Sequence, residues 1–535
     1  MKKDHVSHIN KTLIPAIGLS ALCGGAVAVL IFLFKLISGK VIELSSHLFD
    51  LARGNIAYLP VIVCGAALLG LLASLLLYIE PNSRGGGIPT AVAIVRGLFE
   101  FRWLRSILMI FPSAMITYLC GIPLGNEGPS VQMGSALGRG TVSLFGKKAL
   151  PFDRYIMTGG ACAGFAAATG APLSGIIFAL EEAHRRYSPM LFVTSSVSVT
   201  ASVLVSFVFE RLTGVSATLF DLGAFVPLPL SSIWFAVIPG IACGLVALLF
   251  TRMYRNVGSL ISVRLARVPI GVKISVLFAA SALIGYFVES ATGSGHHLVH
   301  DIMESHRTWK VVALALLTRA VILMFANNAG VTGGLFLPTL AIGALVGSLT
   351  AKAFISVGLI SAEHYALAVG LGMIAYMSAA SRTPLMAIAF GAEALLGVGA
   401  LLPTVICALT AYLVIEFSGE VAFSDTVIEK KTAAERRGKT CVIVESFIEV
   451  KKGSFAVGKE LRDLLLPTSF VVLSVRRKAE GSFSSHVSAG DKLHVRYQTF
   501  DAEYTSRKLE EIFGEQSETF DKAFQGSENH NVPES

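Results

Sequence analysis

Long stretches that carry almost no charge follow one another along most of the chain, separated by polar or glycine-rich breaks. A helix needs about 20 consecutive apolar residues to cross a bilayer. At least eight segments reach that length, and some are long enough for two broken helices: Thr12–Phe34, Leu59–Ile79, Ser106–Gly125, Tyr155–Leu180, Met190–Phe209, Leu222–Thr251, Ala320–Ala351 and Ala394–Ile415. The pattern predicts an all-α polytopic membrane protein.

The membrane part occurs twice. Gly85-x-Gly87 returns as Gly293-x-Gly295, Gly125-x-Glu127-x-Pro129 as Gly334-x-Phe336-x-Pro338, and Pro172–Glu181 as Pro384–Glu393. The offsets of 208, 209 and 212 residues keep the order and nearly the spacing of these landmarks. We therefore predict a duplication within residues 12–428, with repeat one at about 12–210 and repeat two at about 222–417.

The apolar runs stop after Phe417. Residues 429–439 form a charged linker of the kind that leaves a membrane for water. Residues 440–514 then alternate strand and helix patterns and predict a small cytosolic α+β domain. Its elements are expected at Cys441–Val450 (strand), Gly458–Leu465 (short helix), Phe470–Val475 and Lys492–Tyr497 (strands) and Asp501–Phe513 (amphipathic helix). Residues 515–535 are predicted to be a disordered tail, and residues 1–11 a cytosolic N-terminal segment.

Composition agrees with this organisation. Only 15% of the 535 residues are charged and 53% are hydrophobic, and the mean hydropathy is +0.67. The net charge of +8 comes from basic clusters beside apolar segments, which indicate cytoplasmic loops rather than nucleic-acid binding. We expect a multi-pass protein of the cell membrane with both termini in the cytoplasm. The seven cysteines show no CxxC spacing, so neither a disulfide framework nor a zinc site is expected.

Three glycine-rich breaks interrupt the hydrophobic sequence and lead into helix-compatible residues: 85–89, 125–129 and 333–338. The first N–H groups of a helix have no partner within the helix, and the dipole behind them favours an anion. Irregular backbone at membrane depth survives only where it is buried in protein or lines a cavity. For a single break, close helix packing would be favoured over a substrate site by roughly two to one. The repeated placement of the breaks reverses that preference and predicts a substrate site. Gly134, Gly138, Gly343 and Gly347 are assigned to packing.

Two glutamates differ between the repeats. Glu127 lies inside the second break and aligns with Phe336, whereas Glu182 aligns with Ala394. An ionisable residue at membrane depth marks a functional site by default, and protonating Glu127 would vacate an anion site and carry a proton. For Glu182 a plain interfacial ion pair is about as probable as a functional role. Glu181 and Glu393 recur in both repeats and are predicted to be structural, as caps or ion-pair partners.

At these motifs the chain resembles the chloride channel (CLC) family of anion channels and chloride/proton exchangers. GGGIP at 85–89, GNEGP at 125–129 and GLFLP at 334–338 are similar to that family's GSGIP, GREGP and GxFxP. The resemblance implies a homodimer in the lipid membrane, each subunit with its own pore built from inverted repeats and broken half-helices. It also implies that Glu127 is the gate and Glu182 the internal proton relay. The anion site would be formed by Gly86, Ile88, Gly128, Leu335, Phe336 and Phe423.

Two positions depart from that family's pattern. Gly86 stands where the family has a serine, and Phe423 where it has a tyrosine. Two hydroxyl donors are thereby missing, each worth about 1 kcal/mol when the acceptor is neutral and more when it is charged. Weaker central anion binding, a more open inner mouth and looser coupling are expected, and the anion preference stays open.

Residues 440–514 resemble the C-terminal subdomain of RCK (TrkA-C) regulatory domains, through GSFAVGKELRDLLLP and SAGDKLHVRY. That resemblance implies a dimeric sensor of a small ligand, cyclic di-AMP being known for some such domains. Arg476, Arg477 and His494 could meet an anionic ligand, although solvated surface charge is favoured by roughly three to one.

The leading functional hypothesis is proton-coupled chloride antiport, and the alternative is a passive, voltage- or pH-gated channel for chloride or another small anion. An enzyme is not expected, because Glu127 has no nucleophile or base partner in a suitable arrangement, and no cofactor is implied. A sensor or receptor fits poorly. His296, His297, His300 and His306 cluster, but metal binding there rates roughly one in ten, and a pH-sensitive outer loop is favoured.

Overall fold

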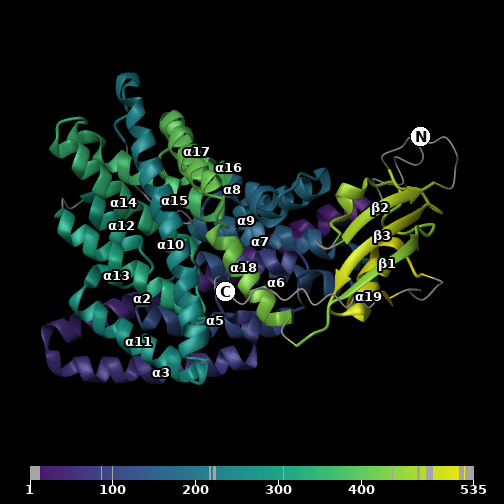
Figure 1. The fold of residues 1–535 in the computed structure, drawn as a ribbon, viewed down its shortest axis with the longest axis horizontal. Coiled ribbons are helices and arrows are strands. Elements are labelled where there is room, and N and C mark those ends of the chain that lie inside the picture. Colours follow the sequence, from purple (N-terminus) through teal and green to yellow (C-terminus); the bar gives the residue numbers. More distant parts are fainter. Residues whose placement is uncertain are drawn as a thin grey trace.

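The computed structural model describes residues 12–85, 87–98, 100–215, 219–220, 225–304, 307–436, 438–466, 470–477, 486–516 and 523–524. It shows a large helical body and, at the right of Figure 1, a small sheet with one helix. Within the described residues, eight helices are long and apolar enough to cross a membrane. The protein is therefore an all-α polytopic membrane protein with a small α+β region at its C-terminal end.

The helices of the two repeats follow in the same order. Repeat one holds α2 (Ile14–Gly54), α3 (Leu59–Ile79), α4 (Ile88–Val95), α5 (Trp103–Leu119), α6 (Glu127–Leu144), α7 (Asp153–Thr169), α8 (Pro172–Phe178) and α9 (Pro189–Thr213). Repeat two holds α10 (Val237–Arg264), α11 (Ile270–Phe287), α12 (His296–Glu304), α13 (Trp309–Asn328), α14 (Phe336–Ser356), α15 (Tyr365–Ser381), α16 (Pro384–Phe390) and α17 (Leu401–Ser418). Equivalent pairs also pack alike, since α6 lies along α7 as α14 lies along α15.

The centre of the body is built from small residues that let helices touch. Nearly every residue of α7 and α15 is buried. A Cβ atom on Gly138 would lie 2.6 Å from the carbonyl oxygen of Ile156, and one on Gly347 would lie 2.5 Å from that of Ala368. The same holds for the carbonyls facing Gly134 and Gly343. The packing role predicted for these four glycines is confirmed, because van der Waals contact holds helices together where lipid is as apolar as the side chains.

Two reciprocal caps join the repeats. The carboxylate of Glu181 accepts bonds from the backbone N–H groups of Leu385 (3.0 Å) and Met386 (2.7 Å) at the start of α16. The carboxylate of Glu393 accepts bonds from the N–H groups of Leu173 (2.8 Å) and Ser174 (3.1 Å) at the start of α8. Each glutamate lies in a π-helical turn that follows the short helix of its own repeat. The predicted structural role of Glu181 and Glu393 is confirmed, and the exchange relates the repeats by an approximate two-fold axis.

The segment Ala320–Ala351 is divided at the predicted break of residues 333–338, which separates α13 from α14. The predicted spans differ from the helices in two respects. The described part of the segment before α10 is not α-helical until Val237, since Pro227 and Pro229 keep it extended and a 3₁₀ helix follows. Helices α11 and α15 were missed. Lys273 interrupts the apolar run of α11, and α15 has only 17 residues, the lower limit of spanning length.

Helix α18 (Phe423–Arg436) leaves the membrane body and packs against α4. Residues 429–436 of the predicted charged linker at 429–439 therefore belong to a helix that packs on the membrane body, and this corrects the prediction of a plain linker. The charged residues lie on a helix whose other side buries Val427 and Ile428. This helix connects the first glycine-rich break to the C-terminal region.

The C-terminal region is a four-stranded sheet in the order β2-β3-β1-β4, with α19 (Ala502–Phe513) packed against it. Its strands are β1 (Val442–Glu449), β2 (Phe470–Arg476), β3 (Lys492–Thr499) and β4 (Ala523–Phe524). The strands and the helix predicted from alternation are confirmed within one or two residues at most ends. The helix predicted at 458–465 shrinks to a 3₁₀ turn, Leu461–Leu464. Buried residues of β1, β3 and α19 form a separate apolar core.

The tail predicted at 515–535 is described only at 515–516 and 523–524, and its other residues lie outside the described part, as do residues 1–11. Ala523 and Phe524 pair with Val444 and Ile443 of β1. These two residues thus differ from the predicted disordered tail, because the open edge of β1 offers them backbone partners.

The C-terminal region rests on the start of α7. The ring of Phe455 packs edge-on against that of Phe152, with centroids 5.2 Å apart. The guanidinium of Arg154 donates to the carbonyl of Leu465, and the ammonium of Lys508 lies 3.2 Å from the carboxylate of Asp153. Both apolar and charged contacts therefore cross the boundary.

Lys459 lies beside this boundary, with only 4% of its surface exposed. Among the described residues, its Nζ atom has no hydrogen-bond partner. Burial lowers the pKa of Lys459 from 10.5 to about 6, because removing water penalises the charged ammonium.

We predict that Lys459 makes the C-terminal domain less stable as the pH falls. Between pH 10.5 and about 6 the unfolded chain binds a proton at Lys459 that the folded chain does not, so the free energy of unfolding decreases through this window and levels off below it. Lys459→Met should raise the urea midpoint at pH 7 and flatten this slope, as measured by pulse proteolysis in detergent. The exposed Lys492 supplies the control, Lys492→Met; equal slopes in both variants would contradict the prediction.

Candidate functional site

Three glycine-rich breaks converge inside the helical body. Gly125 and Gly334 exchange backbone hydrogen bonds, with the N–H of Gly125 2.9 Å from the oxygen of Gly334 and the reverse pair at 2.7 Å. The N–H of Gly85, in the first break, donates to the carbonyl of Gly330 at 3.1 Å. The breaks of the two repeats thus supply hydrogen-bond partners to some of each other's backbone N–H and carbonyl groups, as burial of irregular backbone requires.

Only glycine fits where the breaks touch. Gly87 has a φ of +55°, which L side chains rarely adopt, and a Cβ atom there would collide with the backbone of Gly128. A Cβ atom on Gly128 would lie 2.5 Å from the Cα of Gly334 and 3.2 Å from that of Gly87. These three glycines, from segments far apart in sequence, are in direct backbone contact.

Three helices begin at this contact: α4 at Ile88, α6 at Glu127 and α14 at Phe336, with Leu335 as the N-cap residue of α14. Ile88, Gly128, Leu335 and Phe336 therefore lie at helix starts, where backbone N–H groups lack partners within the helix. Three positive dipole ends around one place favour a small anion. The structure brings these predicted residues together, whereas Gly86 lies outside the described residues.

The carboxylate of Glu127 is folded against the second break. The residue is fully buried, and a Cβ atom on Gly125 would meet both its Oε2 atom and the Cβ of Leu337. Within the described residues, neither carboxylate oxygen forms a hydrogen bond of normal geometry, and the backbone N–H groups of Glu127 and Leu337 interact with the carboxylate without meeting that geometry. A carboxyl group in such surroundings is held weakly and costs free energy while it stays charged. It can give way to a mobile anion or take up a proton.

Aromatic side chains close one side of this place. The ring of Phe336 stands perpendicular to those of Phe165 (centroids 5.1 Å apart) and Phe390 (5.2 Å). These residues come from α14, α7 and α16. They form an apolar wall that keeps bulk water away from the helix starts.

A cavity of about 500 Å³ lies beside the second break. Tyr118 lines it, and the hydroxyl of Tyr118 donates to the carbonyl of Gly125 at 2.8 Å. Arg53, His297 and His300 also line the cavity. Tyr118 therefore connects this cavity to the second break.

Glu182 lies in the π-helical turn after α8 and is 6% exposed. Arg96, directly after α4, donates to the backbone carbonyls of Glu182 and Ala183, both at 2.7 Å. The neighbouring Arg185 is paired with Asp425 at 2.7 Å. These contacts fix the turn through the backbone carbonyl of Glu182.

Phe423 opens α18 and is buried between the rings of Phe250 (5.2 Å) and Tyr254 (5.0 Å). The hydroxyl nearby belongs to Tyr254, and it donates to the Oδ1 atom of Asn327 at 2.6 Å. Phe423 therefore offers a ring edge and no hydrogen-bond donor at this end of the site.

Two lysines that support the site were missed by sequence reasoning. Lys431 of α18 donates to the carbonyls of Asn82 (3.0 Å) and Arg84 (2.9 Å) and to the hydroxyl of Thr90 (2.9 Å). It thereby fixes both sides of the first break. Lys35, near the middle of α2, is half-buried and interacts electrostatically with Glu127. A lone charge inside an apolar run was the available signal for Lys35.

The residues predicted to meet a regulatory ligand have partners within the C-terminal domain. Arg477 pairs with Asp491 (2.8 Å) and His494 with Glu445 (2.8 Å), and the guanidinium of Arg476 lies 5.2 Å from the Phe447 ring. These partners favour structural surface charge over a ligand site. His296, His297 and His300 lie on helix α12 and not in the predicted loop, whereas His306 lies outside the described residues. No cluster able to hold a metal occurs in the described residues.

The fold is that of a membrane protein of two inverted repeats whose glycine-rich breaks meet where three helices begin. The family model of the voltage gated chloride channel matches residues 65–416. The chain belongs to this CLC family.

Curated relatives at 28% identity are named H(+)/Cl(-) exchange transporter ClcA. The protein of Cronobacter sakazakii aligns over 371 residues, 67% of this chain and 78% of its own length. The protein of Salmonella typhimurium aligns over 408 residues, 74% of this chain and 83% of its own length.

Solved structures share the fold. A slow cyanobacterial Cl-/H+ antiporter superposes with a TM-score of 0.71 at 23% identity, covering 79% of this chain and 99% of the antiporter. A CLC-type fluoride/proton antiporter superposes with a TM-score of 0.62 at 19% identity, covering 75% of this chain and 95% of that antiporter. The C-terminal sheet lies beyond the residues that the family model matches.

We predict that Gly128→Ala abolishes most transport while leaving the protein folded. The added methyl group must displace the backbone of Gly334, and such overpacking costs about 1–3 kcal/mol. Chloride efflux from liposomes should fall at least about tenfold. Gly65→Ala in α3 is the control, because nothing lies within 4 Å of its added Cβ; equal efflux from both variants would argue against contact between the breaks at the site.

Proposed function

We propose that this protein exchanges chloride for protons across the cell membrane. The observation that carries the proposal is the meeting of three helix starts around a buried carboxylate, that of Glu127. A carboxylate and a chloride ion seek the same N–H groups. When Glu127 is protonated it no longer competes for them, so proton uptake by Glu127 and anion entry are coupled at one place.

Glu182 acts as the internal proton relay in this proposal. It is buried, it aligns with Ala394 in the other repeat, and it lies next to the cationic side chains of Arg96 and Arg185. Those cations and the nearby Asp425 set a mixed electrostatic environment in which proton uptake and release are both accessible. The relatives named H(+)/Cl(-) exchange transporters support exchange by similarity.

A passive channel for chloride or another small anion is the second candidate. The observation that favours it is Phe423, which brings a ring between Phe250 and Tyr254 where a hydroxyl would hold the anion. With one donor fewer, the central ion binds less tightly and passes more freely. In that case Glu127 only gates.

The exchange hypothesis predicts uphill proton movement driven by a chloride gradient. Purified protein in liposomes loaded with chloride should move protons against their gradient, and Glu127→Gln should abolish this movement because an amide cannot carry the proton. Chloride flux should persist in the variant. Glu363→Gln, at a half-exposed side chain, is the control. Chloride flux without uphill protons in the unmodified protein would establish the channel instead.

The proposal extends to assembly and regulation. We place the protein as a homodimer among membrane lipids, with both termini in the cytoplasm, and we assign it no enzymatic activity. Residues 440–514, similar to RCK (TrkA-C) regulatory domains, would bind a small ligand such as cyclic di-AMP and alter the flux. Their contacts with the start of α7 give such a ligand a mechanical connection to the membrane helices.

Removing residues 440–535 should change the chloride flux per protein at least about twofold, because the helix start of α7 loses the packing of Phe455 and the ion pair of Lys508. Liposome efflux of the truncated and complete chains, at matched protein content, measures this. Unchanged flux would count against a regulatory role for the domain and would leave the exchange hypothesis intact.

A further inference from the structure

Two cationic side chains bond to equivalent backbone carbonyls in the two repeats. Lys431 of α18 donates to two carbonyls that precede Gly85, and Arg319 of α13 donates to the carbonyls at the same positions before Gly293. The acceptors are paired at the offset of 208 residues that also relates these two glycines: Asn82 with Ser290, and Arg84 with Thr292. The duplicated breaks therefore share one kind of support, a cation placed against carbonyl oxygens.

The two cations come from different places in the chain. Arg319 lies on α13, inside repeat two, and is 1% exposed. The residues of α5 that precede it by 208 and 209 positions are Phe111 and Ile110, which are apolar. Lys431 lies on α18, after the end of both repeats. Helix α18 thus supplies repeat one with a cation that this repeat does not carry at the corresponding place.

The break held by Lys431 is the one that borders the transport centre. Gly87 contacts Gly128, and α4 begins directly after Gly87. The third acceptor of Lys431 is the hydroxyl of Thr90 at 2.9 Å, in the first turn of α4. The break held by Arg319 leads instead into α12 and lines the 500 Å³ cavity. Lys431 therefore places an amino group at one of the three helix starts that meet around Glu127.

A positive charge at the start of a helix is disfavoured by the helix dipole. An anion held by the N–H groups of the same helix start offsets this repulsion. Burial lowers the pKa of Lys431 from 10.5 to about 7; Glu435 and Glu80 oppose this shift, whereas Arg84 adds to it. Anion binding and the charged form of Lys431 therefore favour each other.

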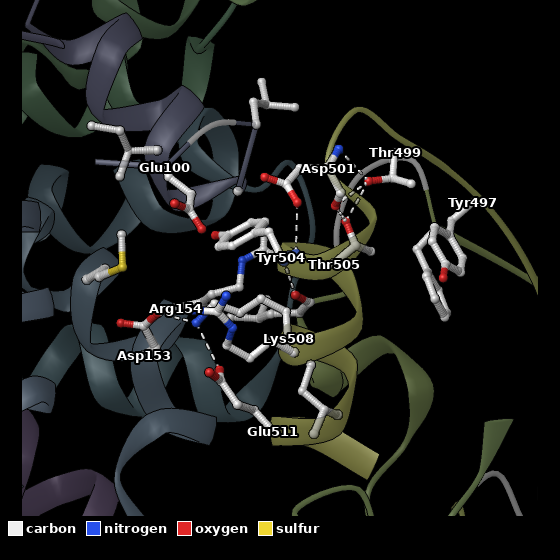
Figure 2. A pocket seen from close by; sticks show the side chains of 18 of the residues that line it. Glu100, Asp153, Arg154, Tyr497, Thr499, Asp501, Tyr504, Thr505, Lys508 and Glu511 are labelled. Carbon is white, nitrogen blue, oxygen red and sulfur yellow. Dashed lines mark hydrogen bonds and ion pairs between the residues drawn. The ribbon is translucent and has the colours of Figure 1, made fainter. Parts of the chain in front are cut away.

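The far end of α18 is held by the C-terminal domain. The guanidinium of Arg436 lies 4.4 Å from the ring centroid of Phe500. Arg436 also lines a cavity of about 390 Å³ between this domain and the membrane body, where Lys508 and Glu511 of α19 lie beside Asp153 of α7 (Figure 2). Together with the buried start of α18, these contacts fix where the helix passes the first break.

We propose that Lys431 is a positioning residue for the transported anion. It holds the carbonyls before the first break together with the first turn of α4, so that this helix start stays against Gly128, and its charge strengthens the attraction of the N–H groups for the anion. The role rests on the proposed transport of chloride and adds a determinant that lies in neither repeat. It also supplies charge to a site in which Gly86 and Phe423 replace two hydroxyl donors.

Chloride binding to the complete protein in detergent, measured by isothermal titration calorimetry, tests this role. At about pH 6 Lys431 is mostly charged, because its pKa lies above that pH. Lys431→Met should weaken chloride binding about tenfold or more, as expected for loss of a charge-assisted contact. Lys431→Arg keeps the charge and the donors and should restore most of the affinity. Thr90→Val removes one acceptor of the ammonium and should weaken binding by a smaller factor.

Two control variants separate the contact with the break from nearby charge and from general stability. Lys430→Met removes the adjacent charge of α18, whose ammonium donates to Asn328 rather than to the first break. Arg319→Met removes the equivalent contact of repeat two and should lower the melting temperature, because it leaves carbonyls unpaired. Both variants should bind chloride within about threefold of the unmodified protein.

Unchanged chloride binding in folded Lys431→Met, or an equal loss in either control, would overturn the role. If Lys431→Met does not fold, unchanged binding in Thr90→Val overturns it instead. Failure of the role would leave the exchange proposal standing, and absence of uphill proton movement would leave the role standing, because a channel binds chloride at the same centre. If the unmodified protein bound no chloride, the anion centre and this role would fall together.

Discussion

The backbone pairing of Gly125 with Gly334 is the contact on which the membrane body depends. Broken helices are costly inside a bilayer, because each unpaired N–H or carbonyl group loses its water. Here the break of one repeat supplies partners to the break of the other, at 2.9 and 2.7 Å. The glycines allow this approach because a side chain would force the two backbones apart. The helix starts beside the pairing keep unpaired N–H groups, and these are what an anion can use.

Symmetry and asymmetry have separate roles in this molecule. Glu181 and Glu393 each cap a short helix of the opposite repeat, so the scaffold is closed by the same contact made twice. The residues proposed to move protons, Glu127 and Glu182, align with Phe336 and Ala394 in the other repeat and have no acidic counterpart there. The two glutamates that both repeats keep accept hydrogen bonds from backbone donors of the opposite repeat and so stabilise the fold.

The C-terminal domain contacts the membrane body where its central helices emerge. Its contacts mix rings, as between Phe455 and Phe152, with ion pairs such as Lys508 to Asp153. Interfaces of this kind allow domains to move relative to one another. Helices α6 and α7 run from this boundary to the glycine-rich breaks, where α6 begins at Glu127 and Phe165 of α7 contacts Phe336.

The sequence alone determined the membrane class, the duplication, the three breaks and most strands of the C-terminal domain. These features are encoded by composition, period and spacing, which are local. It missed α11, where Lys273 interrupts the apolar run, and α15, which is short. Only the tertiary structure decided that Gly125 meets Gly334 across 209 residues, that Lys431 fixes the first break, and that a cavity opens between α7 and α19. Such contacts join residues whose separation along the chain carries no periodic signal, so packing in three dimensions alone reveals them.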